Sequence, residues 1–178
     1  MFAQVESGSI TSFPKGNKGI QIGDNNYPRT IYTLWTEAER NAIGIYTVEI
    51  DETNRKDETF YINTDISYAF GSGKVTGSYG TATAKAIADA NAKDENGDDL
   101  DPVIVIKGLK TQYKNQFNLQ AAGLLAPTDW YVVKATEVSD YSVPSAITTY
   151  RAAVRTKVNA METAIDGCAN VEALITLL

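Results

Sequence analysis

The chain has 178 residues, 43% of them hydrophobic, which is enough to bury the core of one domain or of two small ones. Its net charge of −6 is spread along the sequence without a cluster of lysines and arginines, so nucleic-acid binding is not expected. Histidine is absent and only one cysteine is present, which removes the commonest general base and metal ligand and leaves no internal disulfide.

No segment has the pattern of a membrane span or of a secretion signal. The uninterrupted apolar run at residues 103–106 is far shorter than a bilayer requires. Residues 1–13 lack the charged and then apolar layout of a signal peptide. We therefore expect a protein of the reducing cytoplasm, or of an assembly built there.

The first half of the chain is typical of a small antiparallel β-rich unit with one short helix. Thr36 begins a helical pattern and Glu39 follows three residues later, which predicts a capping box, and Gly44 ends that helix before an extended segment. Residues 60–70 alternate between apolar and polar side chains, which predicts one long strand. The Gly-Ser-Gly sequence that follows predicts a tight turn into a partner strand.

We place a β-rich N-terminal domain at residues 1–90 and a polar linker at residues 91–103. The alanine-rich residues 82–93 predict a short helix, and the Asp-Glu-Asn-Gly-Asp-Asp sequence after it is typical of a solvated loop. Considered as a calcium-binding EF-hand loop, this sequence has Asp99 where glycine is needed and Val105 where glutamate is needed. No metal site is predicted.

Residues 104–178 predict an antiparallel helical hairpin followed by a short terminal helix, so the fold class is α+β. Two segments with apolar side chains every three or four residues are joined by a connector of about 18 residues. The second helix is predicted to begin at Pro144 and to end at Gly167, and Asn170 is predicted to cap the terminal helix. The apolar stripes comprise Leu109, Tyr113, Phe117, Ala121 and Leu124 in the first helix, and Ile147, Tyr150, Val154, Val158, Met161 and Ile165 in the second.

The reactive side chains predict no catalytic, cofactor-binding or metal site. The Gly-Ser-Gly-Lys sequence has Tyr68 and Val75 where a phosphate-binding loop needs glycine and Ser or Thr. No Gly-x-Ser-x-Gly motif occurs, and no histidine is present to activate a serine. Cys168 is interpreted as a structural thiol, and the neighbouring carboxylates of the chain lie in polar, solvated stretches.

The connector begins with Leu-Leu-Ala-Pro-Thr-Asp-Trp-Tyr-Val-Val, residues 124–133. Its proline predicts that the first helix ends there. Trp130 is then predicted to lie buried in the seam between the two helices, where it would bury roughly 200 Å² of surface. Asp129 is predicted to accept a charge-assisted hydrogen bond from Arg151 or Arg155, which would fix the corner.

This segment, followed about twenty positions later by Ile-Thr-Thr-Tyr-Arg-Ala-Ala-Val-Arg, resembles the C-terminal module of bacteriophage tail assembly chaperones. That family has an arginine-containing helix, Leu-Leu, Thr-Asp-Trp and, after a short connector, a helix with Tyr-Arg-x-x-Leu-Arg. The chain departs from this pattern at Pro127, Ile147 and Val154. The matching residues lie within roughly residues 105–165 and are Leu124, Leu125, Thr128, Asp129, Trp130, Tyr150, Arg151 and Arg155.

Residues 27–48 are similar to the β-rich leading region of tail-fibre assembly and related phage accessory proteins, in which a short helix precedes a Gly-Ile-Tyr-x-Val strand. Together the resemblances imply a non-catalytic protein that binds a phage tail or tail-fibre protein and assists its folding or attachment. It would act in the host cytoplasm or on the virion tail. Tyrosines offer contact area at low entropic cost, and the candidates for partner binding are Tyr61, Tyr68, Tyr79, Tyr131 and Tyr141.

Three alternatives remain open from the sequence. The chain could be a permanent component of the virion tail, baseplate or fibre. It could instead be a host-surface glycan-binding module, which only the aromatic residues of the β-rich unit indicate. An enzyme is the least favoured class, because histidine and the common catalytic motifs are missing. A homo-oligomer is compatible with each non-catalytic class.

Overall fold

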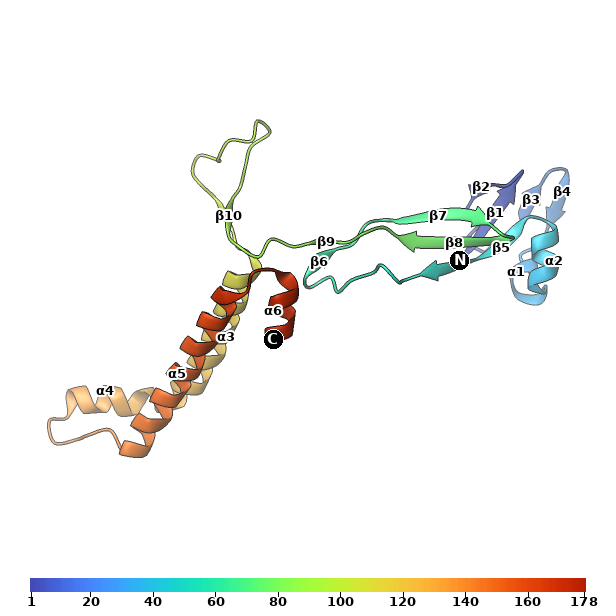
Figure 1. Ribbon diagram of the computed structural model, residues 1–178. Helices are drawn as coiled ribbons and strands as arrows, with labels where there is room; N and C mark the ends of the chain where they lie inside the picture. Colours follow the sequence, from blue (N-terminus) through green and yellow to red (C-terminus); the bar gives the residue numbers. More distant parts are fainter. The chain divides into compact units, whose positions relative to one another are not determined.

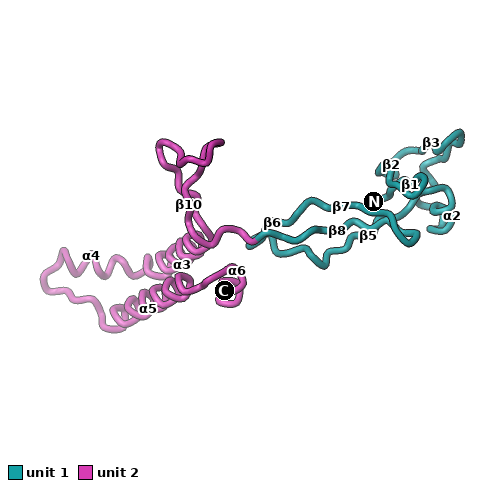
Figure 2. The backbone as a smooth tube through the Cα atoms, turned by 45° about the horizontal axis from the view of Figure 1, so that its top comes forward, with its two compact units in different colours: residues 1–83 teal, residues 84–178 magenta.

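The computed structural model describes residues 1–178, which fold into two compact units, residues 1–83 and residues 84–178 (Figure 2). The first unit is rich in strands and the second is dominated by helices, and the chain ends in a short helix (Figure 1). The predicted α+β class is therefore confirmed. No helix combines the length and the apolar character that a membrane span requires.

A five-stranded sheet forms the centre of the first unit, and its strand order is β2-β1-β5-β8-β7. All neighbouring strands run antiparallel except β5 and β8, which pair in parallel with Val48 opposite Val75. The expectation of a purely antiparallel unit is therefore wrong at this one pairing. The strands are β1 (Phe2–Glu6), β2 (Ser9–Ser12), β5 (Ile45–Asp51), β7 (Ile66–Gly71) and β8 (Lys74–Tyr79).

Small apolar side chains form the core beneath this sheet. Ala3, Val5, Val48 and Val75 are buried together, and aromatic rings pack at their margin. A second cluster joins the sheet to the hairpin of β3 (Ile20–Ile22) and β4 (Asn25–Tyr27) and to helix α1 (Ile31–Leu34). The residues that flank helix α2 (Glu37–Ala42), Trp35 and Ile43, pack against this cluster.

The start of α2 has the predicted capping box. The backbone N–H of Glu39 donates to the Thr36 hydroxyl, and the backbone N–H of Thr36 donates to the Glu39 carboxylate at 2.7 Å. That backbone hydrogen bond is the main reason why the pKa of Glu39 lies below its ordinary value. Gly44 follows the helix with a positive φ, as the sequence predicts.

The predicted long strand over residues 60–70 is wrong in its extent. It is divided into β6 (Tyr61–Ile62) and β7, and Ile62 is 60% exposed although its parity matches the buried face. The interruption between the two strands contains Thr64, whose hydroxyl accepts a hydrogen bond from the Gly80 N–H. The tight turn is confirmed, because Ser72 and Gly73 both have positive φ and connect β7 to β8.

A two-stranded hairpin of β10 (Ala90–Asn91) and β11 (Val105–Ile106) precedes the helices of the second unit. The division between the units falls within β9 (Thr83–Ala84). The short helix predicted over residues 82–93 is wrong. Backbone carbonyls in that segment accept hydrogen bonds from the start of the next helix. These bonds hold the segment extended, although alanine favours helix. Residues 91–103, expected to be a linker, lie within this hairpin.

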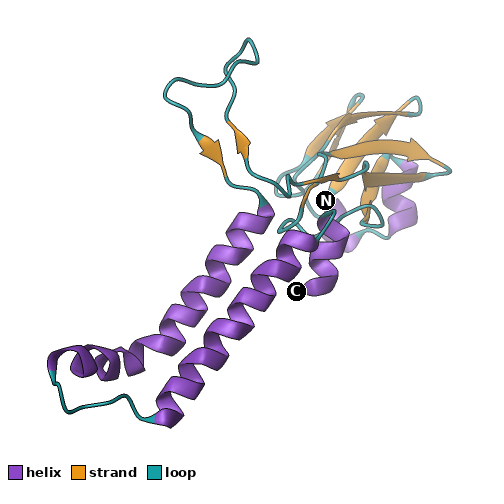
Figure 3. Ribbon diagram, turned by 60° about the vertical axis from the view of Figure 1, so that its left-hand side comes forward, coloured by secondary structure: helices purple, strands orange, loops and turns teal.

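Two long helices, α3 (Leu109–Leu125) and α5 (Ser145–Gly167), lie side by side (Figure 3). A single 3-10 turn (Ala126–Thr128) and helix α4 (Asp129–Glu137) follow α3, so half of the predicted connector is helical. Pro127 interrupts the helix for one turn only, because a proline lacks an N–H donor but tolerates the first turn of a new helix.

The terminal helix α6 (Val171–Leu177) packs on α5. Asn170 caps it as predicted, because its side chain accepts a hydrogen bond from the Ala173 N–H at 2.9 Å. Helix α5 ends at Gly167 as predicted, although Pro144 lies one residue before its first turn rather than in it. The buried residues at this end of the unit include Ile165, Cys168, Val171 and Leu174.

Candidate protein-binding surface at the corner of α3 and α4

Two neighbouring side chains of α5 satisfy the last carbonyls of α3. The Tyr150 hydroxyl donates to the carbonyl oxygen of Leu124 at 3.1 Å, and the Arg151 guanidinium donates to that of Leu125 at 3.0 Å. A helix leaves its final carbonyl groups without partners within the helix. Tyr150 and Arg151 therefore supply donors that the end of α3 lacks, although they lie 26 residues further along the sequence.

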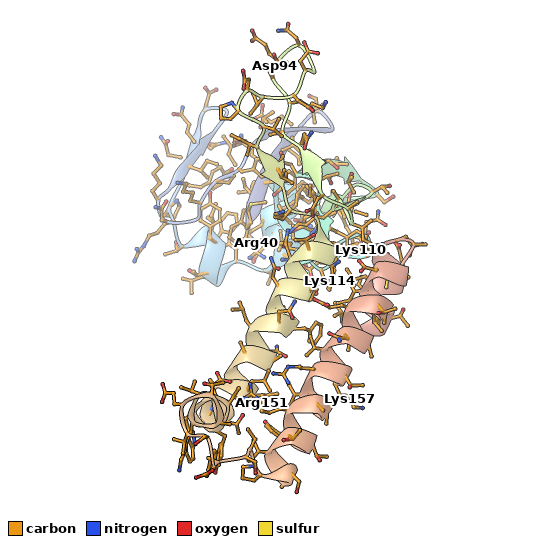
Figure 4. All side chains as sticks on the ribbon, turned by 90° about the vertical axis from the view of Figure 1, so that its left-hand side faces the viewer. Arg40, Asp94, Lys110, Lys114, Arg151 and Lys157 are labelled. Carbon is orange, nitrogen blue, oxygen red and sulfur yellow. The ribbon has the colours of Figure 1, made fainter.

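Arg151 also binds the segment that starts α4. The same nitrogen, Nη1, lies 2.6 Å from the Thr128 hydroxyl and 2.7 Å from the Asp129 carboxylate. The predicted ion pair at the corner is thus confirmed with Arg151. The guanidinium is buried, with Arg151 only 8% exposed, whereas the Asp129 side chain is 56% exposed. Figure 4 shows Arg151 on the side of α5 that faces α3.

Arg155 does not share this role. It lies one turn further along α5 and, with Arg151, lines a pocket of about 250 Å³ whose other residues are Val132, Val143 and Thr148. The sequence could not distinguish the two arginines, because both follow the same helical spacing. The structure distinguishes them, because the guanidinium of Arg151 donates to the Leu125 carbonyl at the end of α3.

The predicted burial of Trp130 in the seam between the helices is wrong. Its side chain is 52% exposed, and its ring lies 3.9 Å from the ring of Tyr131, centroid to centroid. The reason is the unpredicted helix α4. Successive residues of a helix point about 100° apart, so the direction that turns Asp129 towards Arg151 turns Trp130 towards solvent.

Trp130 forms part of an exposed patch on α4. The Lys134 ammonium lies 5.9 Å from the Trp130 ring and 4.3 Å from the Tyr141 ring, at cation–π distance. Val133 and Val138 add exposed aliphatic area to this patch. We call this patch the α4 surface, and it comprises Trp130, Tyr131, Val133, Lys134, Val138 and Tyr141.

The tyrosines of the first unit make contacts within their own unit. Tyr68 packs against the Phe13 ring at 4.7 Å and against the core of the sheet. The Tyr79 ring lies under the guanidinium of Arg55 at 5.8 Å. Tyr61 is half-buried at the start of β6. Partner binding by these three tyrosines stays a prediction, whereas Tyr131 and Tyr141 lie together on the α4 surface.

The chain matches no protein-family model, no curated protein and no solved structure.

Proposed function

We propose that this chain is a non-catalytic phage accessory protein that binds a tail or tail-fibre protein through the α4 surface and assists its folding or attachment. The half-exposed Trp130 carries the proposal. A tryptophan is costly to leave in water, and tryptophan and tyrosine dominate the energetic centres of protein interfaces. The resemblance of the Thr-Asp-Trp and Tyr-Arg sequences to tail assembly chaperones supplies the class of partner.

The mounting of α4 supports this role. Arg151 holds the start of α4 through the Thr128 hydroxyl and the Asp129 carboxylate, and it holds the end of α3 through a carbonyl. A binding surface whose backbone is already ordered loses less conformational entropy when a partner docks. The Tyr-Arg sequence thus holds the helix that presents the aromatic side chains.

A binding experiment tests the proposal. The chain is co-expressed with the tail and tail-fibre proteins of its phage, and co-purification identifies the partner. The Trp130→Ala variant is expected to weaken that complex at least tenfold, because truncation of an interface tryptophan typically costs about 2 kcal/mol or more. Its melting temperature is expected to stay close to that of the original protein, since the ring is half-exposed.

Leu34→Ala is the matched control, because Leu34 is an exposed apolar side chain of the first unit. This variant should bind the partner as the unmodified chain does. If no tail or fibre protein co-purifies or gains solubility, the proposal is wrong. Equal losses of affinity in Trp130→Ala and Leu34→Ala would show that the partner does not bind through the α4 surface.

A permanent place in the virion is the second candidate function. The β10–β11 hairpin exposes four consecutive aliphatic side chains, residues 103–106, and a permanent neighbour would keep them covered. Mass spectrometry of purified virions separates the two functions. A constant copy number relative to the tail proteins favours the permanent component, and absence of the chain favours the chaperone.

A further inference from the structure

The loop of the β10–β11 hairpin contains an Asn-Gly sequence, residues 96 and 97, and no other asparagine of the chain is followed by glycine. Both residues are exposed to solvent and lie in a turn that begins at Asp94, which is labelled in Figure 4. Asparagine is among the thermolabile residues, because its side-chain amide can be lost as ammonia. The residue that follows it in the chain determines how readily this happens.

The backbone of Gly97 leaves its nitrogen accessible. Gly97 has a φ of +89°, which glycine adopts without strain, and it has no side chain to shield the nitrogen. Apart from its own neighbours in the chain, no heavy atom lies within 4 Å of the position that a Cβ would take. The Asn96 amide carbon, Cγ, is the carbon that this nitrogen reaches by closing a five-membered ring.

Attack of the Gly97 nitrogen on Cγ of Asn96 gives a reaction that balances with water alone. A base removes the N–H proton, the nitrogen bonds to Cγ, and the amide group takes up a proton from water and leaves as ammonia. Water then opens the cyclic imide. Cleavage of the new N–Cγ bond gives aspartate, whereas cleavage of the original peptide bond gives isoaspartate, in which the main chain runs through the former side chain.

The Asp94 side chain holds the turn in a form that must open before the ring can close. Its oxygen Oδ1 accepts hydrogen bonds from the N–H groups of Asn96, at 2.8 Å, and of Asp98, at 2.9 Å. The Gly97 N–H donates to the Asp94 carbonyl oxygen at 3.1 Å, so the attacking nitrogen is itself engaged. The hydrogen bond from the Asp98 N–H is the main reason why the pKa of Asp94 lies below its ordinary value.

The surrounding hairpin does little to keep this turn closed. Strands β10 and β11 contain two residues each, and an isolated two-stranded hairpin has little stability of its own in water. The ion pair of Lys93 with Asp99 is exposed to solvent and therefore adds little. Exposed local structure of this kind opens at a much smaller free energy than the whole protein unfolds. The reactive form is thus accessible from the folded chain.

We propose that Asn96 is a site of spontaneous modification, where the chain forms aspartate and isoaspartate at a rate that the Asp94 carboxylate restrains. Either product adds one negative charge between Asp94 and Asp98. Isoaspartate also lengthens the main chain by one atom, which would displace the pairing of Lys93 with Asp99 across the hairpin. The proposal does not depend on the α4 surface or on the identity of the tail partner.

Incubation of the full-length chain at physiological temperature, followed by peptide mass spectrometry, tests the site. Trypsin cleaves after Lys93 and Lys107 and releases residues 94–107, in which Asn96 is the only side-chain amide. We expect two products of equal mass, each heavier than the original peptide by the difference between a carboxylic acid and an amide. Electron-transfer fragmentation identifies isoaspartate. The rate should rise from neutral to mildly alkaline pH, because a base must remove the Gly97 proton.

The Asp94→Ala variant tests the restraint. It leaves the Asn96 and Asp98 N–H groups without their acceptor, so we expect it to react roughly fivefold faster than the unmodified chain. Glu95→Ala is the matched control, because it removes the neighbouring exposed carboxylate, and it should react at the original rate. In a synthetic peptide of residues 94–107, which has no hairpin, Asp94→Ala should leave the rate unchanged. Asn96→Gln should give no product, since a larger ring closes far more slowly.

Three results would overturn the proposal. These are a tryptic peptide that stays unmodified, aspartate formed without isoaspartate, and equal rates in Asp94→Ala and Glu95→Ala. The second result would show direct hydrolysis of the amide in place of attack by Gly97. Trp130→Ala should react at Asn96 as the unmodified chain does, so failure of this proposal is distinguishable from failure of the proposed function.

Discussion

At the scale of single residues, Arg151 joins the end of α3 to the start of α4. One buried guanidinium nitrogen contacts a carbonyl, a hydroxyl and a carboxylate that belong to the end of one helix and the start of another. A buried charge is tolerated where partners of this kind satisfy it, and removal of the cation would leave the Asp129 carboxylate without its ion pair. The same side chain thereby determines which way Trp130 faces.

We expect Arg151→Ala to destabilise the second unit by about 2–4 kcal/mol, because the Leu125 carbonyl loses one of its two side-chain donors and Asp129 loses its cation. Arg151→Lys should recover only part of that loss, since an ammonium cannot reproduce the planar fork of a guanidinium. Urea denaturation followed by circular dichroism measures both values. Arg155→Ala is the control, and an equal loss in that variant would contradict the role given to Arg151.

At the scale of elements, the junction between the β10–β11 hairpin and α3 differs from an ordinary helix start. Gly108 has no side chain that could cap α3, and a carboxylate from 19 residues earlier takes that place. Asp89 accepts hydrogen bonds from the Thr111 side chain and from the Gly108 N–H, and these bonds lower its pKa below the ordinary value. The ionised carboxylate therefore stabilises the junction.

This stabilisation should depend on pH. A lowered pKa means that the contribution is present above the ordinary pKa of about 4 and is lost as the pH falls through the lowered value. We expect Asp89→Asn to lower the melting temperature at pH 7 and to have little effect at strongly acidic pH. Asp24→Asn, on the β3–β4 turn, is the control. A loss from Asp89→Asn that is equal at both pH values would contradict a role for the charge.

At the scale of the whole molecule, the chain has separate cores in its two units. The core of the sheet includes Val48 and Val75, whereas the core of the helical unit includes Ile165 and Leu174. The two units are therefore expected to unfold in two transitions, because cooperativity follows shared packing.

Calorimetry of core variants tests this independence. Ile165→Ala should lower only the transition of the helical unit, by about 2–5 kcal/mol, because it leaves a cavity among fully buried neighbours. Val75→Ala should lower only the other transition, by a smaller amount. Helical ellipticity assigns each transition to its unit. A single transition that both substitutions shift equally would show that the units fold together.

Local patterns in the sequence determined the elements that depend on neighbouring residues alone. The capping box at Thr36, the turn at Ser72 and Gly73, the cap at Asn170 and the apolar stripes of α3 and α5 are all such elements. Each rests on hydrogen bonds or side-chain spacing within a few residues, which the sequence contains directly. The sequence also predicted an ion pair of Asp129 with Arg151 or Arg155, and the structure shows that Arg151 forms it.

Only the tertiary structure decided features that depend on groups far apart in the sequence. Residues 82–93 are extended because their carbonyls bind the start of α3, which outweighs the helical preference of alanine. The parallel pairing of β5 and β8 depends on the register of a whole sheet. Trp130 faces solvent because Arg151 holds Asp129, and a rotation of 100° per residue then sets every side chain of α4.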